Sequence, residues 1–154
     1  MRPIALATTF ALLAAPMAAQ APRPTPEKAE ALVKAAIAYG KKNGMEKLFE
    51  ETNAANGRFH AGPGAELYIF IYDQAGIMKA IGYNTAALVG KNRLELKDPK
   101  GKAFVKEFLA VAKAKGSGWV DYMYENPVTK AVEEKTSYVE MCEGYVIGAG
   151  VYKR

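Results

Sequence analysis

The chain has 154 residues, of which 21 are lysine or arginine and 16 are aspartate or glutamate, giving a formal net charge of +5 at pH 7. This length suits one domain with a single hydrophobic core. The lysines are spread along the chain rather than clustered, which argues against a nucleic-acid-binding surface, although a basic interior that favours an acidic ligand is compatible with the same charge. The single cysteine, Cys142, cannot form an internal disulfide, so the fold depends on packing alone.

The first residues have the layout of a secretory signal peptide. In MRPIALATTFALLAAPMAAQAPRPTP, one arginine precedes an uncharged apolar run from Ile4 to about Ala15, and small residues and prolines follow. The run is shorter than the roughly 20 residues of a membrane-spanning helix, and an uncleaved anchor is the alternative. We predict a signal peptide over residues 1–19, a proline-rich spacer over 20–26 and one domain over 27–154. The mature chain, without a transmembrane segment, is then periplasmic or secreted.

Two helices are predicted after the spacer. Thr25 can cap the first of them, with Pro26 in its first turn. Through residues 27–44 the apolar residues recur at helical spacing, with lysines on the other side. Asn43-Gly44 interrupts this pattern, and a second, shorter helix is predicted from Met45 to near Asn56.

The rest of the chain predicts an antiparallel sheet with one helical connection. The segment ELYIFIYD (66–73) alternates aliphatic and aromatic residues, which indicates a strand buried on both faces, and IMKAIGY (77–83) returns beside it. Residues 103–116 have the pattern of a helix whose apolar side covers one face of the sheet. Because hairpins join strands early and late in the chain, the fold class is α+β rather than a series of βαβ units. The remaining strands are predicted over residues 119–124, 134–142 and 145–152.

Two glycines alternate along the last predicted strand. Gly148 and Gly150 therefore point to the same face, where another element must come close. The simplest candidate is a helix packed tightly against that face. A branched side chain at either position would then have no room.

No catalytic or metal-binding constellation is present in the sequence. His60 is the only histidine and Cys142 the only cysteine, so no histidine pair can hold a metal and no Cys-His pair has a partner for activation. A Cys-x-x-Cys-His motif for haem is absent, and GAGVYK near the end lacks the third glycine of a dinucleotide-binding loop. We therefore predict a protein that is not an enzyme, with no catalytic residues, no metal site and no cofactor.

Several motifs in this chain resemble, in order and spacing, those of the single Cache domain: YIFIYDQAG, LVGKN, LKDPKGKAFVKEF, GSGWVDYMYENP, KTSYV and YVIGAGVY. That family is the extracytoplasmic, PAS-like sensor module of bacterial chemoreceptors and sensor kinases. The resemblance runs from about Glu27 to Tyr152. It implies a twisted antiparallel sheet with a long N-terminal helix on one face. A small-molecule pocket is then expected on the opposite face, under a helical connection that runs from Tyr83 to Gly116.

The resemblance also implies a ligand class and a set of site residues. Family members typically sense small organic acids, amino acids or similar metabolites. The pocket wall would be the aromatic face of the first strand and the hairpin over residues 119–139, in which two tyrosines share a face and offer hydroxyl groups. The lysine that begins the next strand could meet a carboxylate, whose charge would compensate its burial. The predicted ligand-binding residues are Phe70, Tyr72, Tyr83, Tyr122, Tyr124 and Lys135.

Some features leave alternatives open. Many relatives carry a histidine-proline pair just after the second strand, where this chain has Gly82-Tyr83, so an anion contact of that type is not expected there. In receptors the last strand runs into a transmembrane helix and a signalling region, whereas this sequence stops at Arg154. The tyrosines could also simply fill the core with their hydroxyls toward solvent, and Lys135 could extend outward.

These observations predict a free-standing domain that binds a small polar metabolite such as a carboxylate, with a membrane receptor or kinase as its partner. The alternative is a protein-interaction module for such a membrane partner, with a vestigial pocket filled by its own tyrosines. Homodimerisation through the N-terminal helix would suit either function. An enzyme on this scaffold is the least supported hypothesis, and no nucleic-acid partner is expected.

Overall fold

The computed structural model describes residues 22–153, so the predicted signal peptide and the first residues of the spacer lie outside the described part of the chain. The order of elements follows the predicted order, with one additional short helix after the second strand. The helices and strands are α1 (Pro26–Asn43), α2 (Met45–Asn53), β1 (Phe70–Asp73), β2 (Met78–Ile81), α3 (Thr85–Leu88), α4 (Phe104–Lys115), β3 (Ser117–Glu125), β4 (Val132–Cys142) and β5 (Tyr145–Tyr152).

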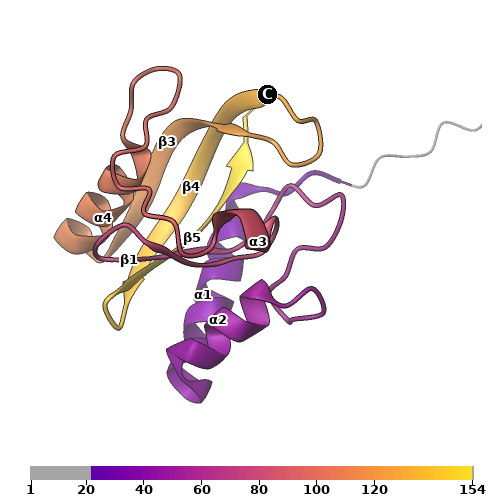
Figure 1. Ribbon diagram of the computed structural model, residues 1–154, viewed down its shortest axis with the longest axis vertical. Coiled ribbons are helices and arrows are strands. Elements are labelled where there is room, and N and C mark those ends of the chain that lie inside the picture. The colour runs from indigo at the N-terminus through magenta and orange to yellow at the C-terminus, as the bar shows by residue number, and fades with distance from the viewer. Residues whose placement is uncertain (1–21, 154) are drawn as a thin grey trace, which may run out of the picture.

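The five strands form one antiparallel sheet in the order β2-β1-β5-β4-β3 (Figure 1). The last strand, β5, therefore lies in the centre of the sheet. It pairs with β1 through Phe70 opposite Gly148, and with β4 through Lys135 opposite Tyr152. The β1–β2 hairpin and the β3–β4 hairpin thus lie on opposite sides of β5 and are joined only through it.

Helix α1 begins where the sequence predicts. The Thr25 side chain accepts a hydrogen bond from the Lys28 backbone N–H at 3.4 Å, and Pro26 occupies the first turn, where its missing N–H costs nothing. The helix ends at Gly44, whose φ of 92° favours glycine. The buried side chains of α1 and α2 pack against one face of the sheet in a single apolar cluster that includes Val33, Leu48, Ile69, Ile71, Ala149 and Val151.

The opposite face of the sheet is aromatic and is covered by α4. Helix α4 buries Phe104 and Phe108 against rings from β1 and β3. The alternation read from ELYIFIYD is confirmed, because Ile69 and Ile71 face α1 whereas Tyr68, Phe70 and Tyr72 face α4. Strand β1 begins only at Phe70, so it is shorter than predicted. The two faces of the sheet are therefore chemically different.

The predicted helix against Gly148 and Gly150 is wrong. Both glycines lie on the aromatic face, and a Cβ atom at Gly148 would meet ring atoms of Phe70 from the neighbouring strand. At Gly150 it would meet the Ser137 hydroxyl and the Thr136 carbonyl of β4. The glycines thus make room for side chains of adjacent strands within the sheet.

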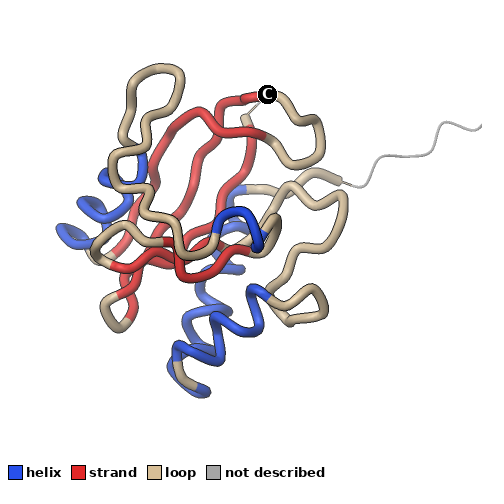
Figure 2. Tube along the Cα trace, viewed as in Figure 1, coloured by secondary structure: helices blue, strands red, loops and turns tan. Residues whose placement is uncertain are grey.

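The segment between β2 and α4 covers the aromatic face and contains only the single turn of α3 (Figure 2). We call residues 84–103 the roof. Its end is held to β3 by Asp98, which is 8% exposed. The Asp98 carboxylate accepts hydrogen bonds at 2.9 Å from the backbone N–H groups of Lys100, Lys102 and Met123. A carboxylate that satisfies buried donors in this way fixes the irregular backbone against the strand.

Candidate functional site

Lys135 lies near the start of β4 on the aromatic face, with Tyr122 of β3 and Tyr152 of β5 directly opposite it. Only 1% of its surface is exposed. Its Nζ atom donates a hydrogen bond to Tyr68 Oη at 2.7 Å. The same atom lies 4.0, 4.9, 5.4 and 5.9 Å from the ring centroids of Tyr68, Tyr152, Tyr124 and Phe70. We call these four rings the aromatic box.

The electrostatic setting of this lysine is unusual. Among residues 22–153 no carboxylate forms an ion pair with Lys135. Burial lowers the pKa of Lys135 well below its ordinary value, because the charged form loses its hydration. The aromatic faces attract a cation but do not replace a counter-ion. Lys135 therefore does not extend outward.

Tyr122 lies beside Lys135 and is 6% exposed. Its ring stacks on Phe104 of α4 at a centroid distance of 4.9 Å. Its hydroxyl lies 3.0 Å from the hydroxyl of the buried Ser137. The hydroxyl therefore does not reach solvent, and burial raises the pKa of Tyr122 well above its ordinary value.

The other predicted residues surround the same volume. Phe70 stacks on Phe108 at 5.1 Å, and Tyr72 lies at 6.4 Å from the same ring. Tyr83 directly precedes the roof, and its ring centroid lies 4.4 Å from that of Tyr68. The structure thus brings all six predicted side chains to one face of the sheet, since alternate residues of paired strands share a face.

Tyr124 connects the sheet to the roof. Arg93 of the roof donates a hydrogen bond from Nη1 to Tyr124 Oη at 3.0 Å, and its guanidinium carbon lies 5.6 Å from the ring centroid. Arg93 is only partly exposed. This contact closes the aromatic face on the side of the roof with a guanidinium group.

The space between these rings is small. A cavity of about 10 Å³ is lined by Tyr68, Phe70, Tyr72, Met78, Ile81, Phe104, Phe108, Tyr122 and Tyr124. This volume holds about one water molecule. A ligand larger than water must therefore move the rings or the roof.

Sequence reasoning missed several residues of this site. Tyr68 could have been found, because it continues the alternation of Phe70 and Tyr72 by two residues. Tyr152 could have been found only from the pairing of β5 with β4. Arg93 lies in an irregular segment with no periodic pattern, so no signal in the sequence points to it.

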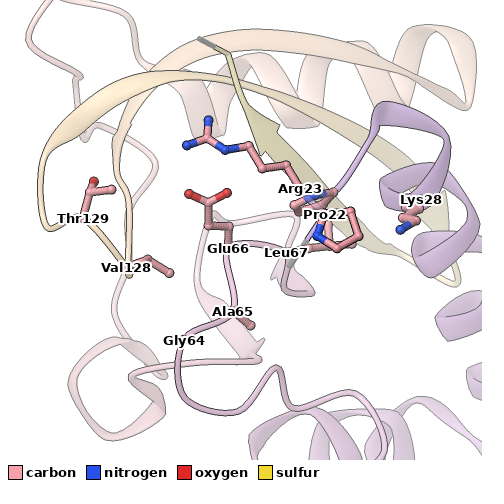
Figure 3. Close-up of a pocket in the computed structure, with 10 residues that line it drawn as sticks. Pro22, Arg23, Lys28, Gly64, Ala65, Glu66, Leu67, Val128 and Thr129 are labelled. Carbon is pink, nitrogen blue, oxygen red and sulfur yellow. The ribbon is translucent and has the colours of Figure 1, made fainter. Parts of the chain in front are cut away.

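Larger cavities open at the surface, among them the following two. One of about 250 Å³ has Tyr122 and Lys135 in its lining and a charged rim that includes Lys100, Asp121 and Glu134. The other, of about 570 Å³, contains none of the predicted site residues. Figure 3 shows it between the start of the described chain at Pro22 and Arg23 and the β3–β4 loop at Val128 and Thr129, with Glu66 between them.

Within residues 22–153, no group of three or more histidine, cysteine, aspartate or glutamate side chains is arranged to hold a metal ion. In the same part of the chain, no helix is both long and apolar enough to cross a bilayer. The features that remain on the aromatic face are a buried lysine amine, hydroxyl groups and rings. This combination suits recognition of a small anion with an apolar part.

The stability of the protein without ligand should rise with pH, from the lowered pKa of Lys135 up to about 10.4. In this window the unfolded chain binds one proton more than the folded chain, because the folded pKa is the lower one. The free energy of unfolding therefore increases with pH, as measured by urea titrations at about pH 7, 8 and 9.

Lys135→Met is the control for this pH dependence, since it removes the titrating group. The contributions of all other titrating groups are present in both proteins and cancel when the two pH profiles are compared. Its free energy of unfolding should rise less steeply than that of the parent. Above about pH 10 the buried tyrosines act in the opposite direction, because burial raises the pKa values of Tyr68 and Tyr122. Equal slopes for parent and variant would contradict the lowered pKa of Lys135.

The comparisons with known proteins concern the sequence and the overall fold. Over 91 residues, 58% of this chain, the sequence is 34% identical to the "Sensor histidine kinase MctS" of Rhizobium johnstonii (strain DSM 114642 / LMG 32736 / 3841), and the match spans 19% of the length of that kinase. A solved "Periplasmic sensor domain of chemotaxis protein" is 26% identical, with a TM-score of 0.63, and the match covers 83% of this chain and 90% of that one.

A second solved structure, described as "Structural basis for carboxylic acid recognition by a Cache chemosensory domain", is 26% identical with a TM-score of 0.66, covering 83% of this chain and 92% of that one. The family model "Single Cache domain 2" matches residues 16–154. These matches agree with the N-terminal helix and the antiparallel sheet described above. The chain therefore belongs to the single Cache domain family of ligand-binding sensor modules.

Proposed function

We propose that this chain is an extracytoplasmic sensor domain that binds a small carboxylate at Lys135. The observation that carries the proposal is the buried lysine inside the aromatic box, which forms no ion pair among the described residues. A buried charge is costly unless it is paired. A ligand carboxylate would supply the pair, and would therefore bind more tightly than a neutral molecule of the same shape.

The size and polarity of the ligand follow from the surroundings of Lys135. The rings of the aromatic box and α4 provide an apolar surface for a short hydrocarbon part. The cavity of about 10 Å³ favours the smallest acids, with the Arg93–Tyr124 contact giving way as the roof adjusts. The similarity to a structure described as recognising carboxylic acids supports the same ligand class.

We propose a location outside the cytoplasm and a membrane partner. The predicted signal peptide over residues 1–19 and the similarity to a periplasmic sensor domain support this location. The similarity to a sensor histidine kinase supports a partner that carries a signal across the membrane. Homodimerisation through the N-terminal helix α1 is part of the proposal.

A thermal-shift screen tests the ligand class. Sodium acetate and propionate should raise the melting temperature, whereas acetamide and ethylammonium chloride of similar size should not, because only an anion pairs with Lys135. At a concentration of about 100 Kd a ligand stabilises the folded state by about 2.7 kcal/mol. Calorimetry of the acids that stabilise the protein gives their Kd values. Stabilisation by acetamide equal to that by acetate would contradict the charge-based recognition.

A second candidate function is supported by the small volume of the cavity. If the tyrosines and Lys135 fill the site permanently, the domain is a protein-interaction module for a membrane partner and its pocket is vestigial. The same screen separates the two functions, since a vestigial pocket gives no stabilisation by any small acid, amino acid or amine.

A further inference from the structure

A short chain of hydrogen bonds connects Lys135 to the end of β3. Lys135 Nζ donates to Tyr68 Oη at 2.7 Å, and the hydroxyl oxygens of Tyr68 and Tyr152 lie 3.4 Å apart. Tyr152 Oη in turn donates to the backbone carbonyl of Glu125 at 2.7 Å. Tyr68 and Tyr152 are 2% and 8% exposed, so water hardly competes for these bonds. This series of hydrogen bonds therefore leads from the proposed ligand site to the last residue of β3.

Each group in this series of hydrogen bonds donates to the next one, from Lys135 toward the Glu125 carbonyl. A phenol carries a single proton. Because the proton of Tyr152 goes to the Glu125 carbonyl, the proton between the two tyrosines must come from Tyr68. Tyr68 is thus committed as a donor to Tyr152 while it accepts from Lys135. Any new acceptor that takes the Tyr68 proton must break the link to Tyr152.

The loop that follows Glu125 is organised by the next residue. Asn126 is fully buried, and its side chain donates to Glu66 at 2.7 Å and accepts from the Val128 backbone N–H at 2.9 Å. Backbone bonds of 2.8 Å from Asn126 N to Ala131 O and from the Lys130 N–H to Asn126 O close the loop. Val128 and Thr129 of this loop line the surface cavity of about 570 Å³. A displacement at Glu125 therefore reaches a part of the surface that lies away from Lys135.

We infer that Tyr152 couples carboxylate binding at Lys135 to the conformation of the loop over residues 126–131. This inference rests on the proposed function, because it requires an anion beside Lys135. A carboxylate oxygen is a stronger acceptor than a phenol oxygen. Tyr68 turns its proton to the carboxylate, Tyr152 loses that donor, and the bond from Tyr152 to Glu125 readjusts. Tyr152 is then a positioning residue that acts on the loop rather than on the ligand.

Nuclear magnetic resonance of the nitrogen-15-labelled protein at saturating sodium acetate tests the coupling. In the parent protein, amide signals near Lys135 and amide signals of residues 126–131 should both shift. Tyr152→Phe keeps the ring in the aromatic box and deletes the hydroxyl that reaches Glu125. In this variant the signals near Lys135 should still shift at saturation, whereas the shifts of the loop should be lost. Tyr138→Phe is the matched control, because its hydroxyl bonds Glu140 on the other face of the sheet, and its loop response should match that of the parent.

The outcomes separate this inference from the proposed function. If loop shifts persist in Tyr152→Phe, or if the parent binds acetate without loop shifts, the coupling through Tyr152 is wrong while the binding site stands. If no amide responds to acetate in the parent, the proposed function and the inference both fail. Hydrogen exchange of the Lys130 and Ala131 amides, measured on the parent with and without acetate, gives an independent test that needs no variant. Unchanged exchange at saturation would overturn the coupling.

Discussion

Lys135→Met should abolish the preference of the protein for acetate over acetamide. Methionine keeps most of the length of the side chain but cannot pair with a carboxylate, so the free energy of acetate binding should weaken by about 2 to 5 kcal/mol. In the absence of ligand the same variant should melt at a higher temperature than the parent, because a buried lysine without a counter-ion destabilises the folded state. Calorimetry with acetate and a thermal melt measure the two effects.

The opposite signs of these effects make the test specific. A variant that merely damaged the fold would lose both binding and stability. Lys113→Met serves as the control, because Lys113 is an exposed residue of α4 and its replacement should leave both quantities unchanged. Acetate binding by Lys135→Met with the affinity of the parent would place the ligand elsewhere in the protein.

Gly150→Val should lower the free energy of unfolding by about 2 kcal/mol or more. The Cβ atom would enter space already occupied by the Ser137 hydroxyl and by the Thr136 carbonyl, and the two γ-methyl groups add further volume. The backbone oxygen cannot move without breaking the pairing of β4 with β5, so the strain is not relieved by a side-chain rotation. Chemical denaturation monitored by circular dichroism gives the change.

A double-mutant cycle at the neighbouring glycine checks the cause. Gly148→Ala should cost less in a Phe70→Leu background than in the parent, because the conflict at that position is with the Phe70 ring. Equal costs in both backgrounds would mean that the ring is not the obstacle. An unchanged denaturation midpoint for Gly150→Val would show that this face of β5 has room for a branched side chain.

The periodic parts of the fold could be predicted from the sequence. The helical spacing before Gly44, the alternation of ELYIFIYD and the hairpin around Asn126 each reflect local geometry that a few neighbouring residues determine. The shared face of Tyr122 and Tyr124 followed from the same rule. The structure confirms these elements with small changes in their ends.

Contacts between strands that are distant in sequence could not be predicted. The position of Tyr152 opposite Lys135, and the Phe70 ring over Gly148, depend on how β5 pairs with its two neighbours. The same limit explains why Gly148 and Gly150 were assigned to a helix contact. Arg93 escaped prediction because the roof that carries it has no regular pattern, and only its contact with Tyr124 identifies it.

The central position of β5 has a consequence for biosynthesis. The β1–β2 hairpin and the β3–β4 hairpin lie on opposite sides of β5, so neither can join the other before residues 145–152 have left the ribosome. Formation of the complete sheet therefore requires residues 145–152, and it depends on contacts that are far apart in sequence and slow to form. Until β5 is in place, β1 and β4 each lack the neighbouring strand that later covers one of their edges.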